Sequence, residues 1–294
     1  VSTVSLKTPE IRKLGDKGIF VVVDGPDGIG KGEMETSLRR CEEKEDKAVF
    51  DSISWCKAYG ELPQLHHFWG IPRPQYHTLM TAEPTFVGSG LEIRNEIISR
   101  ESKEKGRLYP SSVQIEMYSN NRFMQMQRVV VPALEHGLNV LQSRSVASTL
   151  AYQLNTGLTE GLEREDIIKR ILDHPGNKYQ LEHRPDLLII ATIDSAERVI
   201  ERLKSRGANE KDDNSIFDNL KFQEKLKQFY ESDWMRDIFV NVGTHVAYLN
   251  AGLSIEASRG QAAEIFRYFQ KHGKVDTKYL TVDSVLSFSD RRTT

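Results

Sequence analysis

An apolar segment that runs directly into a glycine-rich turn ending in lysine is the feature that most constrains this chain. Residues 18–23 have the continuous apolar character of a strand buried on both faces of a parallel sheet. In the turn that follows, Gly25, Gly28 and Gly30 permit positive φ angles, so that successive backbone N–H groups can surround an anion. Lys31 adds a mobile cation. The pattern predicts a phosphate-binding loop, although an ordinary glycine-rich turn is the alternative.

The residue after the lysine departs from the usual form of such a loop. Gly32 stands where serine or threonine would present a hydroxyl to Mg²⁺. Phosphate binding depends on backbone amides and on the N-terminus of the helix expected at residues 33–44, so this change affects it less than metal binding. The residues that we expect to contact a bound nucleotide are Gly25, Asp27, Gly28, Ile29, Gly30, Lys31, Gly32 and Glu33.

Apolar runs that alternate with longer amphipathic stretches predict an α/β fold. The expected strands lie at 19–23, 78–81, 138–141, 187–192 and 246–250. The expected helices lie at 33–44, 90–101, 111–135, 164–172, 196–206, 219–239 and 255–271. Strands that alternate with helices form right-handed crossovers, which favour a three-layer arrangement of a five-stranded parallel sheet with helices on both faces.

Nothing in the sequence divides this chain into separate domains. We expect a single domain at residues 1–275, with an insertion at 45–76 and a C-terminal tail at 276–294 that is mobile or packs at an edge. The insertion contains Trp55 and Trp69, which makes it too aromatic for a simple linker, and the sequence assigns it no role.

Composition excludes several classes of partner. The formal net charge is −2 and charged residues make up 28% of the chain, so there is no basic excess typical of nucleic-acid binders. No apolar run approaches the roughly 18 residues needed to span a bilayer, and we see no leader segment. Cys41 and Cys56 have no metal or disulfide spacing, which favours free thiols in the cytoplasm. The spacing of His66, His67 and His77 does not indicate a metal site.

Ligands of open α/β sheets bind at the carboxyl ends of the strands. We therefore expect the phosphate loop, residues 81–84, residues 143–145 and Asp194 to meet at one crevice.

From about residue 18 to residue 269, ordered blocks of this sequence resemble the thymidylate kinases, which phosphorylate dTMP to dTDP with ATP. The blocks are residues 24–31, 81–84, 90–94, 118–122, 132–137, 143–153, 184–187 and 202–207. The resemblance implies ATP with Mg²⁺ as cofactors, a deoxynucleoside monophosphate as substrate, and a homodimer formed through the long helix that begins near Ser111.

The resemblance also implies substrate contacts. Tyr118 would stack on thymine, Arg122 would bind its carbonyl edge, and Arg144 would hold the acceptor phosphate with a bidentate guanidinium. Tyr152 would pack against C2′ and Asp27 would bind the 3′-hydroxyl. Base contacts would come from Thr149 and Gln153. Without the resemblance, Tyr118 and Tyr152 are core aromatics and Arg144 is a surface cation.

Catalytic cations are implied in the same way. Lys31, Arg144 and Arg206 would stabilise the transferring phosphoryl group, because phosphoryl transfer requires mainly alignment and charge compensation. The loop has Ile29 where some relatives have arginine, so the additional cation would come from a lid at about 206–218, with Arg202 and Lys211 as further candidates.

Two further departures from the family pattern concern charge. Ser143 replaces an aspartate beside Arg144, and Ala82 replaces an arginine before Glu83 and Pro84. Together with Gly32 they leave the metal ligands unknown and allow two functions. The first is an ATP-dependent deoxynucleoside monophosphate kinase. The second is a catalytically weak or inactive nucleotide-binding paralogue with a sensing or assembly role.

Overall fold

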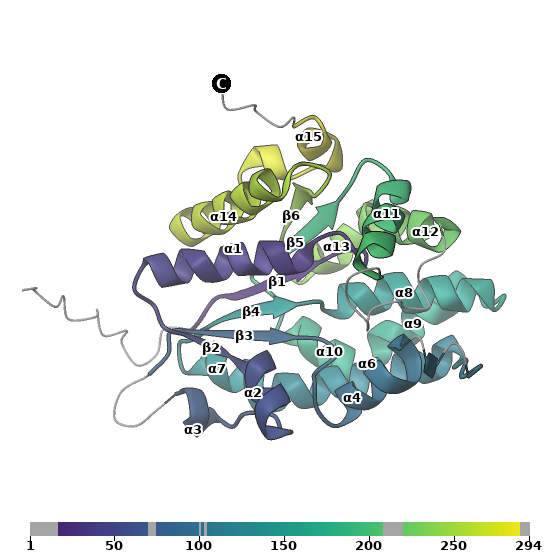
Figure 1. Ribbon diagram of the computed structural model, residues 1–294, viewed down its shortest axis with the longest axis horizontal. Helices are drawn as coiled ribbons and strands as arrows, with labels where there is room; N and C mark the ends of the chain where they lie inside the picture. The colour runs from purple at the N-terminus through teal and green to yellow at the C-terminus, as the bar shows by residue number, and fades with distance from the viewer. Residues whose placement is uncertain (1–16, 70–74, 100, 103–104, 208–219, 289–294) are drawn as a thin grey trace, which may run out of the picture.

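The computed structural model describes residues 17–69, 75–99, 101–102, 105–207 and 220–288 (Figure 1). In this part of the chain, six parallel strands form one sheet in the order β2-β3-β4-β1-β5-β6. The strands are β1 (Phe20–Asp24), β2 (Val49–Asp51), β3 (Thr78–Ala82), β4 (Asn139–Ser143), β5 (Leu187–Thr192) and β6 (His245–Asn250).

The central strand carries the phosphate loop at its carboxyl end. Every residue of β1 is buried, and β1 pairs in parallel with β4 through Phe20 and Val140 and with β5 through Val21 and Leu187. An uninterrupted apolar run suits this position because both faces of the strand are covered. Since β1 ends at Asp24, the glycine-rich turn follows at the carboxyl ends of the strands, between β4 and β5.

Helices cover both faces of the sheet, as Figure 1 shows. On one face, α1 (Lys31–Lys44) packs against α14 (Ile255–His272), and on the other lie α6 (Ser111–Gln125), α7 (Val131–Glu135) and α10 (Pro175–Glu182). The remaining α-helices are α2 (Ser52–Tyr59), α3 (Leu65–Phe68), α4 (Ser89–Ile93), α8 (Val146–Thr159), α9 (Arg164–Asp173), α11 (Ala196–Gly207), α12 (Leu220–Tyr230), α13 (Asp233–Asn241) and α15 (Val282–Leu286). The π-helical turns η1 (Arg94–Ile98) and η2 (Met126–Val130) and the 3₁₀ turn η3 (Thr277–Tyr279) complete the described elements. No helix in this part of the chain is long and apolar enough to cross a membrane.

The three-layer α/β architecture and the five expected strands are confirmed, but the count of five was too low. The sixth strand, β2, lies inside the stretch that we expected to be an insertion, and it pairs with β3 at the sheet edge. It has only three residues, with a half-buried, buried, half-buried pattern, so it lacks the apolar run that identified the others.

The stretch that contains β2 is folded around a cluster of aromatic rings. Phe50 lies with its ring centroid 5.6 Å from Trp55, 5.6 Å from Phe68 and 5.2 Å from Tyr76. The side chain of Asp51 accepts hydrogen bonds from the backbone N–H groups of Ile53 and Ser54, which starts α2 directly after the strand. This stretch therefore extends the sheet rather than standing apart from it.

Several expected helices differ in detail. The helix expected at 111–135 is continuous but contains the π turn η2, and the one at 90–101 consists of α4 and η1 before residue 100, which lies outside the described residues. The helix expected at 219–239 is divided at residues 231–232 into α12 and α13. We did not predict α8, whose residues are buried on nearly all sides and so show no amphipathic pattern.

The packed body extends past the boundary that we drew at residue 275. Tyr279 and Val285 are buried, and the side chain of Asn250 on β6 donates a hydrogen bond to the backbone oxygen of Val285. Thus residues 276–288 cover the β6 edge, whereas 289–294 lie outside the described residues. The single-domain division remains a prediction, and all of the expected lid beyond Gly207 also lies outside them.

Candidate active site

The phosphate loop has the backbone conformation that its glycines permit. Gly25, Gly28 and Gly30 have φ angles of 142°, 76° and 100°, and Gly30 stands directly before the first turn of α1. A Cβ atom at Gly25 would lie 2.8 Å from the backbone oxygen of Ala191 on β5. The loop therefore packs directly against the neighbouring strand and leads into the N-terminal end of α1, a position suited to an anion.

Lys31 lies folded over the loop. Its Nζ atom donates to the backbone oxygens of Gly25 and Pro26 at 2.9 and 2.7 Å, and it lies 3.8 Å from a carboxylate oxygen of Asp27. The ammonium group is thus held where the loop turns, beside the amides that would surround a phosphate.

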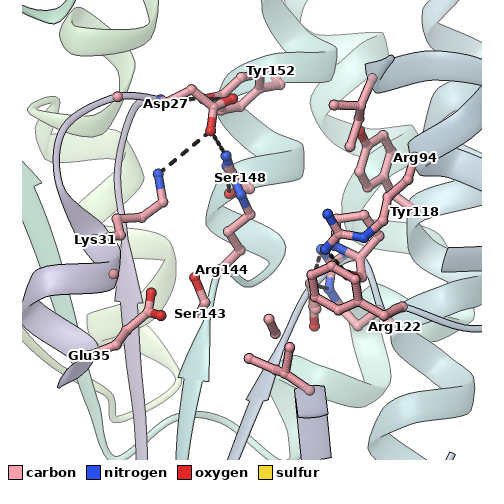
Figure 2. A pocket seen from close by; sticks show the side chains of 18 of the residues that line it. Asp27, Lys31, Glu35, Arg94, Tyr118, Arg122, Ser143, Arg144, Ser148 and Tyr152 are labelled. Carbon is pink, nitrogen blue, oxygen red and sulfur yellow. Dashed lines mark hydrogen bonds and ion pairs between the residues drawn. The ribbon is translucent and has the colours of Figure 1, made fainter. Parts of the chain in front are cut away.

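A cavity of about 410 Å³ opens beside this loop. Its volume lies within the range of small-molecule sites. Loop residues form one wall, the ends of β3 and β4 form the floor, and side chains from η1 and α6 form the opposite wall (Figure 2). The sequence-predicted residues that line it are Asp27, Gly28, Gly30, Lys31, Gly32, Tyr118, Arg122, Arg144, Tyr152 and Gln153. The structure therefore brings the expected donor and acceptor residues into one cleft.

Other expected residues lie behind or beside the cavity. Ile29 is buried and its backbone oxygen accepts a hydrogen bond from Arg202 at 3.3 Å, while Glu33 binds Arg259. Thr149 is buried and accepts a hydrogen bond from Arg122. Gly25 acts through its backbone, as described above.

Asp194 was expected at the crevice, but it pairs with Arg198 and is not one of the described cavity-lining residues. Arg206 lies in the last turn of α11, where the structure does not describe its side chain, and Lys211 lies outside the described residues.

Beside the phosphate loop, Arg144 is held by a carboxylate and a hydroxyl. Its guanidinium is paired with Asp27 and donates to Ser148 Oγ at 3.0 Å, and the Tyr152 hydroxyl donates to Asp27 at 3.0 Å (Figure 2). Burial raises the pKa of Tyr152 to about 12, so the phenol remains a hydrogen-bond donor at neutral pH. Arg144 has a φ of 68°, an unusual conformation for a non-glycine residue and one that is concentrated at functional sites.

Asp24, the last residue of β1, ties the loop to two helices. Its buried carboxylate accepts from its neighbour's backbone N–H at 2.8 Å and from the hydroxyls of Ser145, Ser148 and Tyr230 at 3.0, 2.7 and 2.8 Å. Ser145 also caps the first turn of α8 by accepting from the backbone N–H of Ala147. This network fixes the start of α8, which carries Ser148 and Tyr152, against the phosphate loop.

Arg122 lies at the base of the acceptor wall in a buried ion pair. Its Nε donates to a Glu83 oxygen at 2.8 Å, and its other nitrogens donate to Asn177, to the backbone oxygen of Ser145 and to Thr149. Burial raises the pKa of Glu83, and the nearby Arg122 opposes this effect. Most of the guanidinium donors are thus engaged within the protein, and a base contact by Arg122 stays a prediction.

Sequence reasoning did not single out Arg94 and Glu35, which also line the cavity. Arg94 lies over the Phe86 ring at 3.6 Å and donates to the backbone oxygen of Pro84 at 2.6 Å. It brings a guanidinium to the wall on which Ala82 supplies none. Its position within the 90–94 block was an available signal. Glu35 could have been found by its spacing of four residues from Lys31, which places both on one face of α1.

Few side chains of the cavity could contact a metal ion bound with the nucleotide. In the described residues, no three Asp, Glu, His or Cys side chains form a cluster that could enclose a metal ion. Gly32 has no hydroxyl, and Ser143 offers one at the end of β4. Glu35 brings a carboxyl to the same region, and burial raises its pKa more than the Ser143 hydroxyl and Lys31 lower it. One oxygen of Glu35 is buried without a hydrogen-bond partner among the described residues. These donors fit a Mg²⁺ ion held mainly by substrate phosphates and water.

Comparison with known proteins identifies the family of this chain. The family model described as thymidylate kinase matches residues 71–257, a range that begins after the phosphate loop. A thymidylate kinase of Caldicellulosiruptor saccharolyticus is 28% identical over 69% of this chain and 77% of its own length, and one of Leptospira interrogans is 29% identical over 75% and 84%. The solved thymidylate kinase of Candida albicans superposes with a TM-score of 0.56 at 18% identity, covering 87% of this chain and 94% of its own. This chain belongs to the thymidylate kinase family of nucleoside monophosphate kinases.

Proposed function

We propose that this protein transfers the terminal phosphoryl group of ATP to a deoxynucleoside monophosphate, with dTMP as the preferred acceptor and dTDP as the product. One observation carries the proposal: the glycine-rich loop with Lys31 and the guanidinium of Arg144 face the same cavity from adjacent strand ends. Each is suited to a phosphate. Two phosphate-bearing substrates can therefore meet there end to end.

On the donor side, the loop amides and the start of α1 would bind the ATP phosphates. Lys31 would exchange its contacts with the carbonyls of Gly25 and Pro26 for phosphate oxygens, which are stronger acceptors because they are charged. Mg²⁺ bound with ATP would neutralise charge on the transferring phosphoryl group. Arg202 already contacts the loop at Ile29, so α11 can bring cations to this side, and Arg206 on the same helix remains a proposed catalytic group.

On the acceptor side, Arg144 would bind the monophosphate. Its present partner is Asp27, and an arriving phosphate would replace this carboxylate. Tyr118 is part of the opposite wall, and its aromatic ring would stack on the base there. Tyr152 and Gln153 on α8 also line the cavity. A deoxyribose would pack against them, and Tyr152 would leave little room for a 2′-hydroxyl.

The chemistry asked of the protein is alignment and charge stabilisation. Phosphoryl transfer has a loose transition state with charge spread over the equatorial oxygens, so cations on both sides lower its energy. Lys31 would act on the donor side and Arg144 on the acceptor side. The relatives reported above are named as kinases, so they give no support to the alternative of an inactive paralogue.

A coupled assay for ADP formation tests the proposal. With ATP and Mg²⁺, we expect dTMP to be phosphorylated faster than dUMP, dCMP, dGMP, dAMP or TMP with a ribose sugar. Arg144→Lys should raise KM for dTMP and lower kcat, because lysine cannot bind the phosphate bidentately. Absence of ADP formation above background with every monophosphate would reject the proposal.

We also propose that the protein acts in the cytoplasm as a homodimer formed through α6. Val113 and Met124 on this helix and the neighbouring Leu91 are exposed apolar side chains. Light scattering should give twice the mass of one chain, and a single-chain mass at micromolar concentration would reject the dimer.

A further inference from the structure

The carboxylates that line the cavity differ in how many ion pairs and hydrogen bonds they form. Asp27 pairs with Arg144 and accepts from Tyr152, and Glu83 pairs with Arg122 and accepts from two glutamine side chains. Glu35 differs from both, because its Oε1 atom is buried and lacks a hydrogen-bond partner within the described part of the chain. Leaving a buried carboxylate oxygen unpaired is costly, so this atom requires an explanation.

The position of Glu35 supplies one. It lies one turn after Lys31 on α1 and points into the cavity toward Ser143 at the end of β4 (Figure 2). The Lys31 ammonium is turned away from it toward the loop carbonyls of Gly25 and Pro26. The Glu35 carboxyl therefore lies at the base of the phosphate loop, on the side of the cavity where we propose that the donor phosphates bind.

The requirements of the bound nucleotide point to the same group. A divalent cation held by polyphosphate keeps several waters, and these waters need acceptors on the protein. Gly32 has no side chain to serve them and Ser143 has a single hydroxyl. Asp24 also lies near the loop, but its carboxylate already accepts from a backbone amide and three hydroxyls.

We propose that Glu35 is the metal-side carboxylate of this enzyme and that it supports the Mg²⁺ carried by the donor nucleotide from helix α1, through the waters of the ion. The inference rests on the proposed function in that ATP is the donor. Glu35 is a positioning residue: it touches the hydration shell of the metal rather than the reacting atoms. Ser143 stands at the strand end that faces it, so a carboxylate at either position would reach the same region.

Binding of a nonhydrolysable ATP analogue with a methylene bridge between the β and γ phosphates tests the role without turnover. Calorimetry with and without Mg²⁺ gives the enhancement of affinity by the metal, and electron paramagnetic resonance of Mn²⁺ reports metal binding directly. Glu35→Gln should lower Mn²⁺ affinity in the ternary complex about 10- to 100-fold, the usual effect of losing a group that supports a metal ligand. Metal-free affinity for the analogue should not fall, since a negative charge near the phosphates has been removed.

A relocated carboxylate provides the rescue. The double variant Glu35→Gln with Ser143→Asp should regain most of the metal enhancement. Glu43→Gln is the matched control: Glu43 lies on the same helix, is exposed and pairs with Arg39, so metal binding should equal that of the wild type. Thermal melting of each variant shows that it is folded, and Ser143→Asp alone should bind Mn²⁺ at least as tightly as the wild type.

Two results overturn the inference while leaving the proposed function intact. The first is an unchanged Mn²⁺ affinity in Glu35→Gln, measured with a wild-type chain that phosphorylates dTMP. The second is an equal fall in analogue affinity with and without metal, which would make Glu35 a structural partner of the loop. Failure of the wild-type chain to bind the analogue would instead reject the donor site and the inference together.

Discussion

Removing the charge of Arg122 should destabilise the fold more than any other single change at the site. Its Nη2 atom lies 2.7 Å from Glu83 Oε2, and the two side chains are 1% and 3% exposed. Arg122→Gln leaves the Glu83 carboxylate buried with Gln142 and Gln180 as remaining donors. Breaking a buried pair on one side typically costs about 3–5 kcal/mol. That is a large share of the roughly 5–15 kcal/mol by which native domains are stable.

Urea unfolding followed by circular dichroism measures this cost. The double variant Glu83→Gln with Arg122→Gln should lose much less stability than the sum of the single variants, because no unpaired charge remains. Arg128→Gln, an exposed position on η2, is the control and should change the free energy of unfolding by no more than about 0.5 kcal/mol.

The pH dependence of the variant has a definite sign. Burial raises the pKa of Glu83 and Arg122 opposes it, so without Arg122 the folded-state pKa lies further above the unfolded value. A raised pKa favours folding while the group is protonated, and that stability is lost as pH rises through the folded pKa. Arg122→Gln should therefore differ from the wild type least in mild acid and most at pH 8. If Arg122→Gln unfolds at the wild-type urea concentration and only KM for dTMP rises, then Arg122 reads the base and the structural reasoning is wrong.

Three further outcomes follow from the same geometry. Gly25→Ala should lower the melting temperature and weaken binding of the ATP analogue, because the new Cβ would lie 2.8 Å from a β5 carbonyl oxygen at a φ of 142°. The Cβ of Gly32→Ala instead meets open space among the described residues, so this variant should stabilise α1 by about 0.5–1 kcal/mol in thermal melts. Burial raises the pKa of Cys56 to about 11 from an ordinary value of 9.0, so iodoacetamide at pH 8 should label this thiol about 100-fold more slowly in the folded chain than in the urea-unfolded chain. Because the folded-state pKa is the higher one, the free energy of unfolding should also fall as pH rises from 9 to 11. Equal labelling rates in the folded and unfolded chains would refute the raised pKa. Tyr230→Phe should cost about 1–3 kcal/mol in urea unfolding because Asp24 loses a buried donor, and a variant as stable as the wild type would show that the other donors suffice.

The parts of the fold that could be predicted are those whose signal is local. The five long strands are buried on both faces and appear as apolar runs in the sequence. By contrast, β2 is short and half-buried, and α8 is buried nearly all round, so neither shows a period that identifies its type. The break between α12 and α13 has no proline or glycine to mark it, and only the packing of the two helices reveals it.

The candidate site divides in the same way. Residue types and their convergence on one cavity could be predicted, because parallel strands place their carboxyl ends together. Their partners could not. Glu83 and Asn177 lie 39 and 55 positions from Arg122 in the chain, and nothing in the sequence around any of them indicates that they meet. The resemblance suggested a base contact for Arg122, whereas the structure shows how much of its hydrogen-bonding capacity is engaged inside the protein.

The ion pairs of Asp27 with Lys31 and Arg144 show how a carboxylate can hold two phosphate-binding cations close together. Lys31 and Arg144 must both stand near the place where phosphates meet, and two cations so close repel one another when no anion is bound. The Asp27 carboxylate contacts both, at 3.8 Å from the lysine and in a direct ion pair with the arginine. It thereby keeps the cations in place at low cost and can be displaced by phosphate oxygens, which carry more charge. The loop carboxylate that the resemblance assigned to a sugar hydroxyl thus also holds Lys31 and Arg144 in place, and this role follows from electrostatics alone.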